Sequence, residues 1–125
     1  MVDFKNKSII KLKSIKLDEG KKFVQDIIIP GEIVISAFAS MRDKLVFTDK
    51  RIISINVQGI TGTKVDYTSI PYSKIQAYSV ETAGMLDLDA ELDIIISGLG
   101  TVRFELTGSS NIKDICLKMS EKILD

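Results

Sequence analysis

The middle of this 125-residue chain is a series of short β-branched runs separated by turn-forming residues. This pattern is typical of an all-β meander in which each run is one strand. The separators contain Gly, Pro or Asp, which tolerate turn geometry. The predicted strands are 32–39, 44–48, 51–57, 64–70, 75–82, 87–96 and 101–107. Seven strands at this spacing indicate a barrel or sandwich.

Helical periodicity precedes this region. Four apolar side chains recur at the spacing of one helix face between Asp18, a suitable N-cap, and Pro30-Gly31, a strong stop signal. They are Phe23, Val24, Ile27 and Ile28. The Lys-rich stretch from Phe4 to Leu17 fits neither a helix nor a strand period, and we expect it to be partly helical.

A second amphipathic helix is predicted after Gly108, with Ser110 or Asn111 as N-cap. Its apolar stripe consists of Ile112, Ile115, Cys116, Met119 and Ile123. A single helix with such a stripe most plausibly packs across an open barrel end, where strands alone leave core side chains facing water. The expected architecture is a mainly β, seven-stranded barrel that is capped by its C-terminal helix and preceded by an N-terminal helical segment.

The composition excludes several classes of activity. The chain has no His, which removes His-based acid/base catalysis, Ser-His and Cys-His nucleophiles and imidazole-bound zinc. Its 17 basic residues balance 17 acidic ones, unlike the basic profile of a nucleic-acid binder. We therefore expect no nucleic-acid partner and no cofactor. An enzyme that uses a pair of carboxylates is a third, less favoured interpretation, because exposed Asp and Glu seldom have raised pKa values without burial.

The distribution of single residues indicates a cytoplasmic location. Cys116 is the one cysteine, so an intramolecular disulfide cannot form. Lys interrupts every apolar run before Asp18, which does not fit a secretory signal. No stretch approaches the roughly 20 apolar residues of a bilayer-spanning helix. We expect a reducing, cytoplasmic setting.

Charge is unevenly spread along the chain. Residues 1–22 hold seven Lys against three acidic residues, and residues 80–93 hold five acidic residues and no basic ones. On a strand, alternation would place one acidic row on one face: Asp87, Asp89, Glu91 and Asp93. Counted from Asp87, the sixth and twelfth positions lack the Gly and Glu of a calcium loop, and side chains on an extended strand spread apart. We expect a solvated or partner-facing acidic row and no metal site.

The Lys-rich start leaves three interpretations open. It can be a solvated helix or frayed tail. It can lie on an anionic membrane surface through Lys5, Lys7, Lys11 and Lys13. It can also contact the acidic strand of a neighbouring subunit, a head-to-tail match that a rotation would close into a ring. Of the last two, we favour the ring contact, because the complementary patch is present on the same chain.

Several strings in the β-rich region resemble one known family. They are Val46-Phe47-Thr48-Asp49-Lys50-Arg51, Tyr67-Thr68-Ser69-Ile70-Pro71-Tyr72, and Val80-Glu81-Thr82-Ala83-Gly84 followed by Asp87-Leu88-Asp89-Ala90-Glu91-Leu92. In these strings and in their order along the chain, the sequence resembles the bacterial pleckstrin-homology-like (PH-like) domain family. The resemblance implies a helix-capped barrel, assembly into cyclic rings and a role in protein contacts without catalysis. No residue here matches a phosphoinositide motif.

These observations combine into one expected organisation and function. Residues 1–30 would form a segment packed on or extending from a PH-like domain at 31–125. The domain would self-assemble into a cyclic homo-oligomer and mediate contacts with an unknown protein; the alternative is peripheral binding to anionic lipid through the Lys-rich start. The expected interaction surface consists of Asp49, Lys50, Arg51, Tyr72, Glu81, Asp87, Asp89 and Glu91.

Overall fold

The computed structural model of the chain describes residues 1–5, 9–58, 64–82, 89–108 and 112–124. The elements in chain order are β1 (Ile9–Ser14), α1 (Leu17–Val24), β2 (Val34–Ala39), β3 (Asp43–Thr48), β4 (Arg51–Gln58), β5 (Lys64–Pro71), the 3-10 turn η1 (Tyr72–Lys74), β6 (Ala77–Thr82), β7 (Ala90–Ile96), β8 (Gly100–Thr107) and α2 (Ile112–Ile123). The seven strands predicted between residues 32 and 107 are confirmed, with shifted ends. The predicted C-terminal helix is also confirmed, and its expected N-cap lies outside the described residues.

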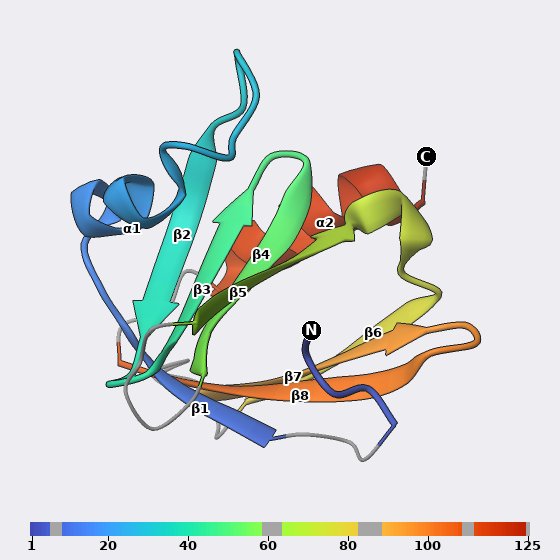
Figure 1. Ribbon diagram of the computed structural model, residues 1–125. Helices are drawn as coiled ribbons and strands as arrows, with labels where there is room; N and C mark the ends of the chain where they lie inside the picture. Colours follow the sequence, from blue (N-terminus) through green and yellow to red (C-terminus); the bar gives the residue numbers. More distant parts are fainter. Residues whose placement is uncertain (6–8, 59–63, 83–88, 109–111, 125) are drawn as a thin grey trace.

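All strands join one curved sheet in the order β5-β4-β3-β2-β1-β8-β7-β6. Neighbouring strands are antiparallel except β1 and β8, which are parallel. The sheet curls so that its two arms face each other, and α2 lies against the side where they approach (Figure 1). This is the expected mainly β class with a C-terminal helix, with eight strands in the described part of the chain rather than seven.

The additional strand corrects our expectation that Phe4 to Leu17 is partly helical. Residues Ile9–Ser14 form β1, which lies between β2 and β8. Leu12 is buried in the core while Lys11 and Lys13 are exposed, so the stretch follows a strand alternation. Pairing on both sides of the strand decides its conformation, and the local sequence carries too weak a period to show this.

The predicted first helix is present but shorter than expected. It spans Leu17–Val24, and its N-cap is Lys16, with no side-chain capping bond, rather than Asp18. Asp18 and Glu19 instead occupy the first turn, where acidic side chains favour the helix dipole. The helix packs closely on β2, because a Cβ at Gly20 would collide with the side chain of Ala37.

Two apolar layers hold these elements together. The inner layer fills the barrel, and α2 seals it with the buried side chains of Ile112, Ile115 and Met119. The outer layer lies between α1 and the outer face of β2, β3 and β4. Its buried members are Val24, Val34, Ala37, Val46, Ile53 and Ile55. The expected segment 1–30 thus enters the sheet through β1 and packs on it through α1.

The first residues close the barrel opposite α2, so residues 1–5 are not a frayed tail. Val2 and Phe4 are buried in the inner layer. The Val2 N–H donates to Thr68 Oγ1 at 3.1 Å on β5, and the Thr101 N–H on β8 donates to the Phe4 carbonyl at 3.2 Å. The chain start therefore bridges the two arms of the sheet. Within the described residues, neither helix is long and apolar enough to cross a membrane.

Candidate functional site

Carboxylates form a row across the outer face of three neighbouring strands. Glu81 on β6 lies opposite Glu91 on β7, which lies opposite Glu105 on β8, and Lys11 on β1 continues the row. Asp89 is exposed just before β7. A hollow of about 400 Å³ opens here. Its lining consists of Glu81, Thr82, Asp89, Ala90, Glu91, Glu105, Leu106 and Thr107. Like charges directly opposite one another destabilise a sheet, so this arrangement favours a basic partner.

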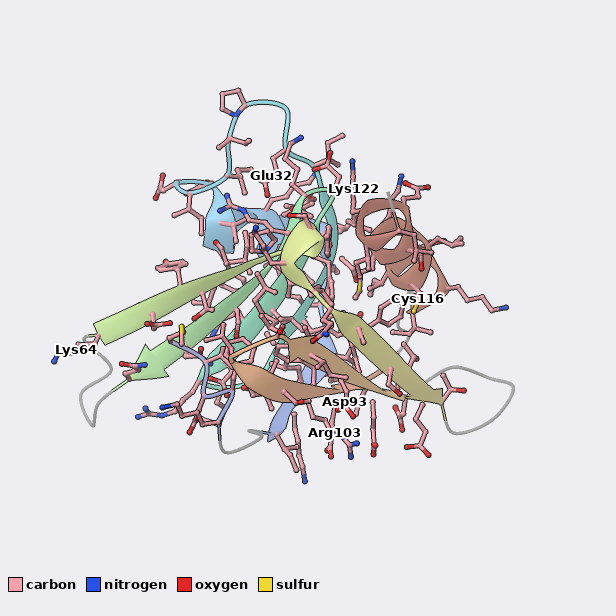
Figure 2. All side chains as sticks on the ribbon, turned by 90° about the vertical axis from the view of Figure 1, so that its right-hand side faces the viewer. Glu32, Lys64, Asp93, Arg103, Cys116 and Lys122 are labelled. Atoms are coloured by element: carbon pink, nitrogen blue, oxygen red, sulfur yellow. The ribbon has the colours of Figure 1, made fainter. Side chains whose placement is uncertain are left out.

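Two basic side chains of the same chain already pair with this row. Arg103 donates from Nε and Nη2 to the two carboxylate oxygens of Asp93 at 2.7 and 2.9 Å, and its Nη1 lies 3.1 Å from Glu91. Figure 2 shows Asp93 and Arg103 side by side on the outer face. The hydrogen bonds that Arg103 donates to Asp93, and then the charge of Asp93, raise the pKa of the Arg103 guanidinium. Lys11 lies 3.9 Å from Glu105. Glu81 and Asp89 therefore form the exposed acidic end of the row.

The alternation predicted for the acidic strand is confirmed at the described positions. The core-facing side chains are Ala90, Leu92 and Ile94. Asp89, Glu91 and Asp93 are exposed or half-buried. Asp87 and Leu88 lie outside the described residues. Within the described residues, no three Cys, Asp or Glu side chains are grouped so as to hold a metal ion.

Arg51 has a structural role in the folded chain. Its Nε and Nη2 atoms bind the two carboxylate oxygens of Glu32 at 3.0 Å each, and Nη2 also donates to the Ile27 carbonyl at 2.7 Å. Thr48 Oγ1 donates to Glu32 at 2.7 Å. Burial would raise the pKa of Glu32, but hydrogen bonds from Arg51, Thr48 and the Ile29 N–H, with the Arg51 charge, hold it below its usual range. This network ties the α1–β2 connection to the β3–β4 hairpin.

Tyr72 was expected on the interaction surface, and this prediction is wrong. Its side chain is 1% exposed, and its hydroxyl donates to the Thr48 carbonyl at 2.6 Å. Burial, followed by the charges of Asp49 and Glu32, raises the pKa of the phenol. Tyr72 lies in the 3-10 turn that follows Pro71, and its ring points inward. The sequence pattern between β5 and β6 does not reveal this direction.

The other predicted residues of the hairpin tip, Asp49 and Lys50, differ in their roles. Asp49 is half-buried and its Oδ1 accepts the Ile33 N–H at 2.9 Å, so it stabilises the loop before β2. Lys50 is exposed. The hairpin tip and the acidic row lie on different parts of the sheet, since Asp49–Arg51 connect β3 and β4 while the row crosses β6 to β8. The structure does not bring the predicted site residues together as one surface.

A second hollow, not predicted from the sequence, lies between the edge strand β6 and α2. We call it the β6–α2 groove; its volume is about 540 Å³. It is lined by Tyr78, Val80, Thr82, Ile112, Lys113, Cys116, Leu117 and Ser120. Figure 2 shows Cys116 on the side of α2 that faces β6. Leu117 is 64% exposed and lies outside the buried apolar stripe of α2. An apolar residue outside that stripe is the one signal in the sequence that could have indicated the groove.

The opposite end of the sheet has a different character. In the described part of the chain, β5 pairs with β4 alone, and β6 with β7 alone. The outer face of β5 presents Val65 and Tyr67, which are 46% and 47% exposed. Lys64 at the start of the strand is exposed and projects away from the body of the molecule on the side opposite α2 (Figure 2). The sheet thus ends in one basic-apolar edge and one edge beside an apolar groove and an acidic row.

Known proteins resemble this chain in sequence and in structure. A family model described as the bacterial PH domain matches residues 3–123. The uncharacterized protein YjqA of Bacillus subtilis is 50% identical over 91 residues, which cover 71% of this chain and 73% of the relative. A crystal structure of a protein with a pleckstrin-homology domain from Shewanella loihica has a TM-score of 0.73 and 36% identity, covering 91% of this chain and 98% of that chain. The pleckstrin-homology domain from Shewanella amazonensis has a TM-score of 0.61 and 38% identity, covering 89% and 90%.

Proposed function

Because this chain belongs to the bacterial PH domain family, we propose that it is a non-enzymatic protein-interaction module whose copies assemble head to tail into a cyclic homo-oligomer. The observation that supports this best is the difference between the two ends of the sheet. One end carries exposed Lys64, Val65 and Tyr67, and the other carries the acidic Glu81 and Asp89. Two different, complementary patches on one chain favour a heterologous contact, which closes into a ring when the rotation allows it.

Among the described strands, β5 and β6 each have a strand partner on one side only, and the edge of a sheet is a template for pairing with another chain. The acidic row adds a preference for a basic partner. Arg103 on β8 pairs with Glu91 and Asp93, and Lys11 on β1 lies near Glu105, so these three acidic groups already have a basic neighbour in their own subunit. We therefore expect the basic partner of Glu81 and Asp89 to be the Lys64 end of β5 on another copy.

The chemistry of the described residues supports a role without catalysis. Cys116 is a half-buried free thiol, and burial raises its pKa. A thiol whose pKa is raised is a poor nucleophile at neutral pH, and the chain has no His to activate it. The buried carboxylate Glu32 and the buried phenol Tyr72 serve the structural network that surrounds Arg51.

The membrane alternative loses part of its physical basis. An interfacial segment needs apolar side chains that enter the lipid beside its Lys residues. In β1 the core takes Leu12 and half-buries Ile10, so the strand offers mainly Lys11, Lys13 and one exposed Ile9. We therefore rank assembly above lipid binding.

Light scattering coupled to size exclusion tests the proposal at low and high salt. We expect one discrete multiple of 13.8 kDa at low salt, with weaker assembly at high salt. The variant Asp89→Lys should lower the mass, while Asp26→Lys, an exposed reversal after α1, should leave it unchanged. A 13.8 kDa monomer at both salts would refute the assembly. Salt-sensitive sedimentation of that monomer with anionic vesicles would support the lipid alternative instead.

A further inference from the structure

The connection between α1 and β2, residues 25–33, is a projecting feature that the proposed assembly does not use. It rises beyond the body of the molecule next to the first residues of β2 (Figure 1). Ile29 and Ile33 stand on either side of its tip and are 53% and 62% exposed, and Pro30 between them is also exposed. Residues 27–28, by contrast, pack on the outer layer. The connection therefore anchors itself with one pair of apolar side chains and presents a second pair to its surroundings.

Hydrogen bonds hold the α1–β2 connection in one shape. The Ile29 N–H donates to Glu32 Oε1 at 3.1 Å, and the Glu32 N–H donates to the Ile29 carbonyl at 3.0 Å, so the tip is a closed turn. Arg51 on β4 binds the Glu32 carboxylate, and Asp49 on the β3–β4 hairpin accepts the Ile33 N–H at 2.9 Å. Figure 2 shows Glu32 below the projecting turn. A preformed loop loses little conformational entropy on binding, so the two exposed isoleucines are ready to contact a partner.

Basic side chains surround the exposed isoleucines. Lys21 and Lys22, in the last turn of α1, line a hollow of about 360 Å³ beside the connection. Lys50 is exposed at the tip of the neighbouring hairpin, while Asp26 is the exposed acidic side chain of the connection. The carboxylate of Glu32, also in the lining of the hollow, is buried and already neutralised by its ion pair. Three exposed Lys against one exposed Asp leave an excess of two positive charges around the apolar tip.

We infer that the α1–β2 connection docks the protein on the surface of an anionic lipid bilayer. A projecting tip cannot enclose a peptide, but it can enter a bilayer surface, which yields around it. The isoleucine side chains reach the boundary between headgroups and acyl chains, where interfacial apolar groups settle. The lysines stay at the level of the headgroups, where each attracts anionic lipid. This contact does not depend on the proposed assembly, and it differs from binding through the Lys-rich start, where β1 turns Leu12 into the core.

Sedimentation with vesicles tests the docking in the full chain. We expect the protein to sediment with vesicles of phosphatidylglycerol and phosphatidylcholine at low salt, and to be released by high salt. The double variant Ile29→Ser, Ile33→Ser should weaken this binding about tenfold or more, and so should Lys21→Glu, Lys22→Glu. Met41→Ser, which replaces a 98% exposed apolar side chain beyond the opposite end of β2, is the matched control. Far-UV circular dichroism verifies that every variant is folded.

A fluorescent label at the tip measures insertion directly. Cys116 is the one native thiol, so an environment-sensitive dye is attached to Ile29→Cys in a chain that also carries Cys116→Ala. Anionic vesicles should shift the emission of this dye to shorter wavelength, because the label leaves water for the interface. The same dye on Met41→Cys, in the same background, should show no shift.

Two controls separate this inference from the other roles of the chain. Lys13→Glu on β1 should leave vesicle binding unchanged, and the Ile29→Ser, Ile33→Ser variant should keep the native mass in light scattering. No binding of the native protein to anionic vesicles, or an equal loss in Lys13→Glu, would overturn the inference and leave assembly intact. A lower mass in the isoleucine variant would assign the connection to a contact between copies and would also overturn it. A native monomer whose vesicle binding requires Ile29 and Ile33 would support the inference and refute the assembly.

Discussion

The ion pair between the buried Glu32 and the half-buried Arg51 allows a quantitative test of the network that joins the α1–β2 connection to the β3–β4 hairpin. In the Arg51→Ala variant, Glu32 keeps its bonds from Thr48 and the Ile29 N–H but loses two guanidinium bonds of 3.0 Å each. Its side chain is 1% exposed, so the carboxylate would stay out of water without its counter-charge. Removing one partner of a buried pair costs about 3–5 kcal/mol. This is a large part of the free energy of unfolding of a typical domain, which is about 5–15 kcal/mol.

The dependence on pH distinguishes a lost charge from lost packing. In the native protein the pKa of Glu32 is lower than its usual 4.5, so the network contributes stability above that pH and loses it as pH falls through the folded value. In Arg51→Ala, burial is less fully offset and the folded pKa should lie above that of the unfolded chain. Folded Glu32 then binds a proton more tightly, and the deficit of the variant should shrink as pH falls.

Urea unfolding followed by far-UV circular dichroism at one protein concentration measures both effects, near neutral pH and at about pH 4. Glu32→Gln combined with Arg51→Ala should recover part of the loss, because the buried charge is gone. Lys50→Ala, at an exposed position of the same hairpin, is the control. The reasoning fails if Arg51→Ala costs less than about 1 kcal/mol, as an exposed pair would, or if its deficit does not change with pH.

Three further substitutions test individual contacts by thermal or urea unfolding. Gly20→Ala should lower the melting temperature although Ala favours helices, because its Cβ would collide with Ala37; an unchanged or higher value would contradict this packing. Met119→Ala in the fully buried face of α2 should cost about 2–5 kcal/mol, and a loss near zero would show that α2 does not seal the barrel. Tyr72→Phe leaves the Thr48 carbonyl without its 2.6 Å donor and should cost about 1–3 kcal/mol; neutrality would refute the role of the bond.

Side-chain alternation and turn residues were sufficient to predict most of the sheet. Ala90, Leu92 and Ile94 face the core as expected, because a half-buried strand repeats its pattern every second residue. The strand at Ile9–Ser14 escaped prediction, because its alternation is short and Ile9 breaks it with an exposed apolar side chain. The inward position of Tyr72 escaped as well, because a short 3-10 turn has no period that could reveal its direction.

The same distinction between local pattern and tertiary structure applies to the candidate sites. The local pattern alone determined that the chain carries a mainly β domain with a C-terminal amphipathic helix, and that acidic side chains share one face of one strand. Tertiary structure decided that Glu81, Glu91 and Glu105 stand in one row, that Arg103 neutralises part of it, and that β6 and α2 enclose a groove. The physical reason is that side-chain alternation is set by neighbours along the chain, whereas register, edge positions and helix docking are set by pairing between distant segments.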